Sequence, residues 1–228
     1  MPASGAVTRN TLRQQIAGAL RDEVLAGRLR PGQEFTVKQI AEQYGVSATP
    51  VREALVDLAG QGLLDSNQHR GFQVHRFSVE DFRGMIEARS LIVDGIFREG
   101  GTPRAHAATG PALVSVRRRA EEAARAARCG DLNVLISYDL RFWRELGALV
   151  TNRYIGEFLD RLRVQSWVFA VPRLRAEPEP ELGEWLWSGH EQLVDAITRG
   201  DAAAARALIA ADDDLALRWA ERLERRPE

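Results

Sequence analysis

The stretch "GVSATPVREAL", residues 45–55, places small polar residues and an arginine at the point where a helix should begin. Gly45 interrupts the preceding segment, Ser47 is a suitable N-cap, and Pro50 fits a first helical turn because its missing N–H has no helical partner there. Beyond them, apolar residues follow the i, i+3, i+4, i+7 spacing of a buried stripe: Val51, Ala54, Leu55 and Leu58. The sequence therefore predicts a helix from Ser47 to about Ala59 whose polar start is exposed.

The segments on either side of this helix complete a recognisable order of elements. Helices are predicted at 8–26 and 37–44, with glycine or proline after each of them. Residues 63–77 alternate like two short strands around a turn at 67–71. Three helices followed by a small hairpin, with a tight turn before the third helix, are typical of a winged helix-turn-helix domain.

The polar start of the third helix has the chemistry of a DNA contact. Small hydroxyl groups and free backbone N–H groups suit phosphate oxygens at a helix N-terminus, as at Ser47 and Thr49. An arginine one turn later, Arg52, can donate to O6 and N7 of guanine. An ordinary capped surface helix is the alternative for the motif alone, but the order of elements around it favours DNA binding.

The remainder of the chain predicts helices and no strand. The predicted spans are 79–99, 110–129, 131–150, 152–171, 182–199 and 201–224, with a proline-rich surface loop at 176–182. The predicted fold class is mainly α, with two domains. Residues 1–77 are predicted to form a winged helix-turn-helix of three helices and a small β-hairpin, and residues 78–228 an all-α helical bundle.

Three ionisable residues of the second domain fall on apolar helix stripes: Asp139, His190 and Asp212. A buried ionisable group needs a partner or a metal ion, because an unpaired buried charge is costly. Each residue alone is explained by a hydrogen bond in the core. Together, on three helices, they indicate a shared cavity in the bundle interior.

The overall composition limits the cellular setting. The chain has a net charge of −1 and a single cysteine, Cys129, which excludes an internal disulfide framework. No segment approaches the roughly 20 apolar residues that span a bilayer, and the start of the chain has no stretch typical of a secretory signal. We expect a cytoplasmic protein with no membrane association.

The stretch "LRPGQEFTVKQIAEQYGVSATPVREALVDLAGQGLLDSNQHRGFQV" resembles the N-terminal domain of a GntR-family transcriptional regulator. The resemblance covers residues 9–76 and rests on the PG turn, GVS, TPVREAL and the RG of the wing. It implies a set of DNA-binding residues: Lys38, Ser47, Thr49, Pro50, Arg52, Arg70 and Gly71. Family members usually carry arginine where this chain has Ala48, which affects the expected operator sequence.

The stretches "DLRFWRELGALVTN" and "GHEQLVDAITRGDAAAARALIAADDD" resemble the FCD ligand-binding domain of FadR-like GntR regulators, over residues 80–222. In metal-binding members an Asp and three His residues hold a divalent ion, commonly zinc or nickel. The matching positions here are Asp139, Trp143, His190 and Asp212. Asp139, His190 and Asp212 remain potential metal ligands, but an indole cannot coordinate. We therefore expect weak or absent metal binding and an effector that binds the cavity directly.

Effectors in this subgroup tend to be small carboxylates, sugar acids or acyl compounds. Arg89 matches a recurrent arginine of the domain and could pair with a carboxylate, and a structural salt bridge is its alternative role. The predicted effector-binding residues are Arg89, Asp139, Trp143, His190 and Asp212. Trp143, Trp185 and Trp187 could line the cavity.

The leading hypothesis is a ligand-responsive bacterial transcriptional regulator, acting as a repressor. It would bind a palindromic double-stranded DNA operator as a homodimer and take a small carboxylate as its effector. One alternative is a metal-dependent hydrolase built on the helical domain, but the chain has no H-E-x-x-H pair, G-x-S-x-G elbow or phosphate-binding glycine loop. A DNA-binding architectural protein without a ligand is the other alternative, and it leaves the polar residues inside the helical stripes without a purpose.

Overall fold

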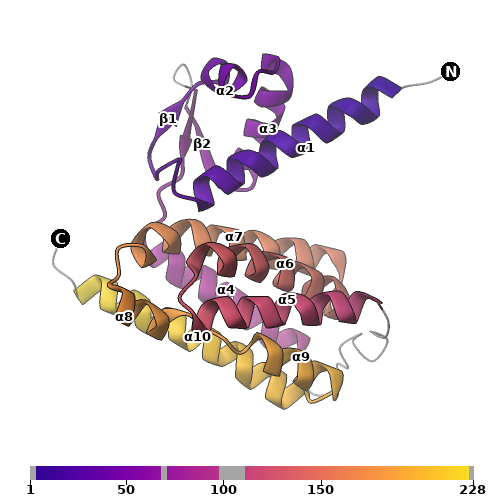
Figure 1. Cartoon of the computed structure of the whole chain (residues 1–228), viewed down its shortest axis with the longest axis vertical. Coiled ribbons are helices and arrows are strands. Elements are labelled where there is room, and N and C mark those ends of the chain that lie inside the picture. The colour runs from indigo at the N-terminus through magenta and orange to yellow at the C-terminus, as the bar shows by residue number, and fades with distance from the viewer. Residues whose placement is uncertain (1–3, 68–70, 98–110, 226–228) are drawn as a thin grey trace. The chain divides into compact units, whose positions relative to one another are not determined.

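A computed structural model describes residues 4–67, 71–97 and 111–225 of the chain (Figure 1). The chain divides into two compact units, Met1–Phe77 and Ser78–Glu228. Within the described part, no helix combines the length and the hydropathy needed to cross a membrane.

The N-terminal unit contains three helices and a small antiparallel sheet. The elements are α1 (Ser4–Leu25), β1 (Glu34–Phe35), α2 (Val37–Tyr44), α3 (Ala48–Gly60), β2 (Leu64–Asn67) and β3 (Gly71–Val74). The predicted hairpin is confirmed as β2 and β3, but the sheet has three strands in the order β1-β3-β2. Sequence alternation could not predict β1, because two residues are too few to show a period.

The turn between α2 and α3 is fixed by local interactions. Thr36 and Gln39 form a capping box at the start of α2, and Gly45 ends it in a left-handed conformation (φ 63°) that favours glycine. The predicted apolar stripe of α3 is buried, and α3 packs against α1, α2 and β2. The structure thus confirms a winged helix-turn-helix with α3 in the position of the recognition helix.

The C-terminal unit is all helical among its described residues. Its elements are α4 (Val79–Ile96), α5 (Pro111–Arg128), α6 (Leu132–Val150), α7 (Arg153–Leu174), α8 (Glu179–Leu182), the 3₁₀ turn Gly183–Trp185, α9 (His190–Thr198) and α10 (Ala202–Arg225). Six of these helices pack as a closed ring in the order α4, α7, α6, α5, α9, α10 and back to α4 (Figure 1). Every helix of the ring therefore has two neighbours to bury its apolar sides.

The segment between α7 and α9 differs from the prediction. The predicted helix 182–199 begins only at His190, and part of the predicted loop 176–182 is the short helix α8. Gly189 precedes α9, and a Cβ atom there would lie 2.5 Å from the ring of Trp187. The indole folded back over this glycine accounts for a turn in the chain where the apolar periodicity suggested a continuous helix.

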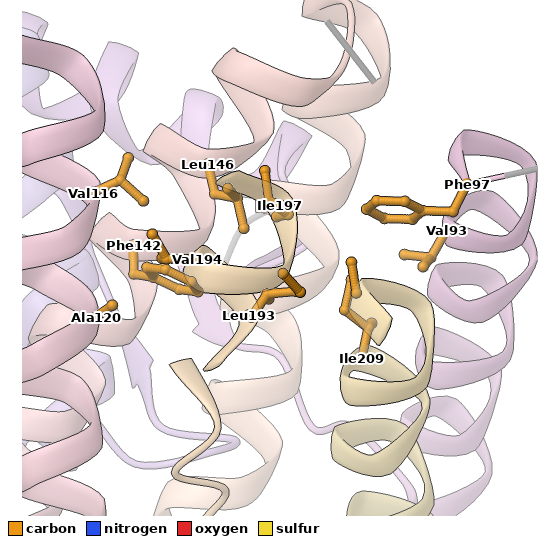
Figure 2. Packing of buried hydrophobic residues seen from close by; sticks show 12 residues of the cluster. Val93, Phe97, Val116, Ala120, Phe142, Leu146, Leu193, Val194, Ile197 and Ile209 are labelled. Atoms are coloured by element: carbon orange, nitrogen blue, oxygen red, sulfur yellow. The ribbon is translucent and has the colours of Figure 1, made fainter. Parts of the chain in front are cut away.

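The interior of the bundle contains two apolar regions. One is the cluster in Figure 2, in which α4, α5, α6, α9 and α10 contribute side chains such as Val93, Phe142 and Ile209. The other is aromatic: the rings of Phe82 and Phe169 stack at 4.5 Å, and Trp219 packs edge-on against both. The candidate site lies at helix positions between these two regions.

Candidate functional site

Five helices contribute charged or titratable side chains to one buried group, which we call the polar layer. It consists of Arg89 from α4, Asp139 from α6, Arg163 from α7, His190 from α9, and Asp212 and Asp213 from α10. Asp139 and His190 lie about one helical turn before Phe142 and Leu193 of the apolar cluster, and Asp212 lies one turn after Ile209. The helical repeat thus places the polar layer next to the apolar cluster.

Asp139 is the centre of the polar layer and is only 1% exposed. Its Oδ1 accepts hydrogen bonds from Nη2 of Arg163 (2.6 Å), Nε1 of Trp143 (3.0 Å) and Nε2 of His190 (3.1 Å). Its Oδ2 accepts from Nε of Arg163 (2.8 Å) and Nε1 of Trp167 (2.6 Å). These donors replace the water that the buried carboxylate has lost.

Arg163 connects Asp139 to the C-terminal helix. Besides its two bonds to Asp139, its Nη1 donates to Oδ2 of Asp212 at 2.8 Å. The guanidinium carbon lies 4.9 Å from the centre of the Trp143 ring, a cation–π arrangement. Arg163 therefore links α7 to α6 and α10 through charge-assisted hydrogen bonds.

Arg89 forms the second ion pair of the layer. Its Nε donates to Oδ1 of Asp213 at 2.7 Å, its Nη2 donates to the same oxygen, and Nη2 also lies 3.3 Å from Oδ2 of Asp212. The structural salt bridge proposed as one role of Arg89 is therefore present. Its Nη1 makes no hydrogen bond to any residue that the structure describes.

The two arginines affect the layer's carboxylates differently. Burial alone would raise the pKa of Asp139, but Arg163 and the hydrogen bond from His190 outweigh it and hold that pKa well below its ordinary range. At Asp213, burial outweighs Arg89, and the pKa of this carboxyl is raised. The carboxylates of Asp139 and Asp212 raise the pKa of Arg163 further above its ordinary value, so this guanidinium stays charged at every accessible pH.

Acidification should destabilise the helical unit in a manner that depends on Asp139. Because its folded-state pKa lies below the unfolded value of about 3.9, its stabilisation is complete above that pH and is lost as the pH falls below it. We expect unfolding free energies measured by urea titration to fall more steeply between about pH 5 and pH 3 in the wild type than in Asp139→Asn. An Asp94→Asn control, at an exposed site, should keep the wild-type slope, and equal slopes in all three proteins would contradict the assignment.

Two cavities border the polar layer. The larger, which we call the tryptophan cavity, has a volume of about 80 Å³. Its lining includes Trp167, Trp185, Trp187 and Trp219, together with Arg89, Asp139, Arg163 and Asp212. The smaller, which we call the aliphatic cavity, has a volume of about 50 Å³ and a lining that includes Val93, Leu146, Val150, Ile197 and Ile209. Arg89 and Arg163 belong to both linings, so the two guanidinium groups lie between the cavities.

Two residues of the tryptophan cavity's lining carry buried polar atoms that no described residue satisfies. The indole N–H groups of Trp185 and Trp219 are buried and have no hydrogen-bond partner among the described residues. Trp219 as a whole is only 3% exposed, so an unmade bond there is costly. Both groups are donors, and a ligand with acceptor oxygens would satisfy them.

The residues that the sequence assigned to an effector site do come together. Asp139, His190, Asp212 and Arg89 are in the polar layer, and Trp143 is in contact with it. Trp185 and Trp187 line the tryptophan cavity, as expected, and Trp143 lines the aliphatic cavity.

Sequence reasoning missed three further members of the site: Arg163, Trp167 and Asp213. A usable signal existed for Arg163, because Leu159, Trp167 and Ala170 lie at i−4, i+4 and i+7 from it and form an apolar stripe of α7. A cation on an apolar stripe needs a buried partner, just as an anion does. The buried carboxylates of the predicted site in turn needed a cation to offset their negative charge.

The residues present do not fit a divalent metal ion. Among the described residues, no group of three or more His, Cys, Asp or Glu side chains is placed to hold one. The carboxylates of Asp139 and Asp212 are bridged by Arg163, and Trp143 directs an N–H donor at Asp139. A metal ligand must offer a lone pair, and an indole N–H cannot.

In the N-terminal unit, the predicted DNA-contacting side chains are free at the start of α3. Ser47 occupies the N-cap position, but its hydroxyl makes no capping hydrogen bond, contrary to the expectation that it caps the helix. Ser47, Thr49 and Arg52 are exposed and make no hydrogen bond or ion pair to any described residue. Lys38 on α2 is exposed as well and has only a long ion pair with Glu42, at 3.8 Å. These four side chains need no partner inside the chain and are free to contact phosphates and bases.

The other three predicted DNA-binding residues are not shown to have side chains available for DNA. Pro50 is buried in the unit, so packing accounts for it without DNA. Gly71 has φ +100°, and a Cβ atom there would lie 2.5 Å from the carbonyl oxygen of Phe35, so the β1–β3 contact requires glycine. Arg70 lies outside the described residues. DNA contacts by these three stay predictions.

Comparison with known families agrees with both units. Residues 7–74 match the family described as bacterial regulatory proteins, gntR family, and residues 103–212 match the FCD domain. The chain belongs to the gntR family of bacterial regulatory proteins and carries an FCD effector-binding domain, a combination consistent with the FadR-like subgroup. Members of this family are helix-turn-helix transcriptional regulators that bind DNA.

Individual relatives agree with this assignment, and solved structures share the fold. The chain is 28% identical over 195 residues to a Paenarthrobacter nicotinovorans protein named "Probable D-xylose utilization operon transcriptional repressor", covering 86% of this chain and 82% of the relative. It is 26% identical over 177 residues to the HTH-type transcriptional regulator McbR of Escherichia coli K12, covering 76% and 75%. Its fold is similar to that of the solved E. coli McbR/YncC structure, with a TM-score of 0.77 at 21% identity over 93% of this chain and 98% of that one. A transcriptional regulator from Rhodococcus sp. RHA1 gives a TM-score of 0.70 at 23% identity, covering 94% and 99%.

Proposed function

We propose that the protein is a ligand-responsive repressor whose effector binds in the tryptophan cavity and releases the protein from its operator. The observation that carries this proposal is the cavity itself: it lies in the FCD domain, borders the polar layer and is lined by Trp185 and Trp219, whose buried indole N–H groups have no partner among the described residues. A soluble structural bundle would gain stability from filling such a space with apolar side chains. In a purely architectural DNA-binding protein, which binds no ligand, this cavity would have no function.

The donors around the tryptophan cavity favour an effector rich in acceptor oxygens, which a small carboxylate provides. Besides the two indole N–H groups, Nη1 of Arg89 has no partner among the described residues. Carboxylate oxygens accept strongly from guanidinium and indole donors. A sugar acid combines a carboxylate with hydroxyl groups, and the name of the Paenarthrobacter relative associates that protein with D-xylose utilisation. Xylonate and xylose are therefore the first pair of compounds to compare.

We further propose that the protein binds its operator as a homodimer, with one α3 helix in each half-site of a palindrome. A protein with two-fold symmetry reads a two-fold symmetric sequence, and half-sites are then spaced by about one helical turn of DNA or a multiple of it. A duplex with one half-site scrambled should bind markedly more weakly than the full palindrome.

The direct experiment measures operator release. A duplex is selected from a random pool by the full-length protein, and its fluorescence anisotropy is followed with each member of a panel of small carboxylates, with D-xylose as the uncharged comparison. A compound that dissociates the complex and raises the melting temperature of the helical unit supports the proposal. Compounds that stabilise the protein without changing DNA affinity would contradict the repressor mechanism.

Trp219→Phe should weaken effector binding without removing the aromatic ring from the core. The substitution deletes a single N–H donor, so we expect a loss of about 1 kcal/mol, or roughly fivefold in Kd, for the compound that releases DNA. Titration calorimetry of the full-length protein measures it. The matched control is Tyr154→Phe, which removes a polar group from a side chain that is 77% exposed on α7. Identical affinities in wild type and Trp219→Phe would place the effector away from this indole.

A further inference from the structure

We propose that Arg163 and Trp143 together form a built-in cationic centre that takes the place of a divalent metal ion, so that the FCD domain of this protein works without metal. The inference concerns the construction of the polar layer and holds whether or not the tryptophan cavity binds an effector. It assigns a role to Trp143 that goes beyond the loss of a metal ligand.

The first step is the position of the Arg163 guanidinium. Its Nη1 and Nη2 reach Asp212 and Asp139 at 2.8 and 2.6 Å, and those are the two acidic residues that a metal would need. A zinc ion held by both would lie about 2.0–2.2 Å from an oxygen of each. The space between the two carboxylates is filled by a planar cation that hydrogen-bonds to both of them.

The second step is the protonation of the remaining ligand. Both oxygens of Asp139 already accept hydrogen bonds from groups that can only donate, namely the Arg163 guanidinium and the indoles of Trp143 and Trp167. Nε2 of His190, 3.1 Å from Oδ1 of Asp139, must therefore carry its hydrogen and cannot offer a lone pair to a metal. Nδ1 of His190 is buried without a partner among the described residues, and it points away from this bond.

The third step is the pairing of Trp143 with Arg163. The indole does two things at once: its N–H donates to Asp139, and its ring lies 4.9 Å from the guanidinium carbon. An aromatic face next to a desolvated cation stabilises that cation, and tryptophan does so best. An imidazole at position 143 would give the guanidinium a smaller and poorer surface. The arginine and the tryptophan thus depend on each other.

The test begins with the wild-type chain as purified without chelators. Elemental analysis should find far less than one zinc or nickel per chain, and the melting temperature should change by less than about 1 °C with EDTA or with added zinc. A stoichiometric metal, or a fall of several degrees with EDTA, would overturn the proposal.

Two variants test whether the guanidinium is the reason that metal is excluded. Trp143→His supplies an imidazole but keeps Arg163, and it should remain free of metal. Trp143→His combined with Arg163→Gln exposes two carboxylates and two imidazoles, and it should bind about one zinc or nickel per chain and gain several degrees in melting temperature when zinc is added. The proposal would be overturned if both variants bound about one metal ion per chain, or if neither bound any. Circular dichroism of both proteins checks that the helices are retained.

Discussion

Replacing Asp139 with alanine should lower the free energy of unfolding of the helical unit by about 3–5 kcal/mol, because one partner of a buried ion pair is removed while the other stays buried. Asp139 accepts five hydrogen bonds, so its loss leaves donors of Arg163, Trp143, Trp167 and His190 without an acceptor. An unsatisfied buried donor bears its full desolvation cost, whereas a bond exchanged with water costs little. We expect this substitution to have the largest effect on stability of any single change considered.

The positions of the tryptophans allow the unfolding of the helical unit to be measured separately. All five tryptophans lie between residues 143 and 219, so tryptophan fluorescence during urea unfolding reports on the helical unit alone. The matched control is Asp94→Ala, which breaks an exposed ion pair with Arg206 and should cost less than about 0.5 kcal/mol. A loss of under about 1 kcal/mol in Asp139→Ala would mean that the polar layer relaxes freely, and the central role of this carboxylate would be wrong.

Arg52→Ala should nearly abolish specific operator binding. A bidentate contact of arginine with guanine is worth about 1–3 kcal/mol, and the proposed homodimer would lose it in both half-sites, so the expected cost is about 2–6 kcal/mol. At about 1.4 kcal/mol for each factor of ten, the expected rise in Kd is at least about 30-fold. Because Arg52 is exposed and makes no hydrogen bond or ion pair to a described residue, its truncation should leave the stability of the N-terminal unit unchanged.

Fluorescence anisotropy with the selected duplex and with a scrambled duplex separates specific from general binding. Arg28→Ala removes an equal charge from the same unit, at a side chain paired with Glu23, and should have a small effect. Arg52→Lys keeps the charge but not the planar fork, so it should retain non-specific binding and lose most of the discrimination. Equal losses on both duplexes in Arg52→Ala would show a phosphate contact in place of a base contact.

The elements that the sequence predicted correctly have their signals within a few neighbouring residues. The helix 37–44 carries its capping residues and its terminating glycine, and its predicted bounds match those of α2. The predicted helix 182–199 was wrong at its start because apolar spacing continues through Trp185 and Trp187, whose side chains line a cavity formed by distant segments. Periodicity shows that a residue is buried, but it does not show which backbone conformation buries it.

The candidate site shows the same limit. Asp139, His190 and Asp212 were predicted from their positions on apolar stripes, and they are buried together. The partner that Asp139 and Asp212 share, Arg163, is 24 residues from the first and 49 from the second along the chain. Local patterns identify groups that need a partner, but which group supplies it is decided by packing between helices. The resemblance to metal-binding relatives marked Asp139, His190 and Asp212 as potential metal ligands, but it gave no indication that Arg163 bonds to two of them.

The Arg89 salt bridge joins two neighbouring helices of the closed ring, and one of these helices begins at the boundary between the two units. Arg89 lies on α4, which begins directly after the boundary between the two units, and Asp213 lies on the neighbouring α10. The capping box of Ser78 and Asp81 stiffens the start of α4, about 16 Å of helix away from Arg89. A ligand that competes with Asp213 for this guanidinium would loosen the contact between α4 and α10, and α4 is the helix that continues the chain from the DNA-binding unit.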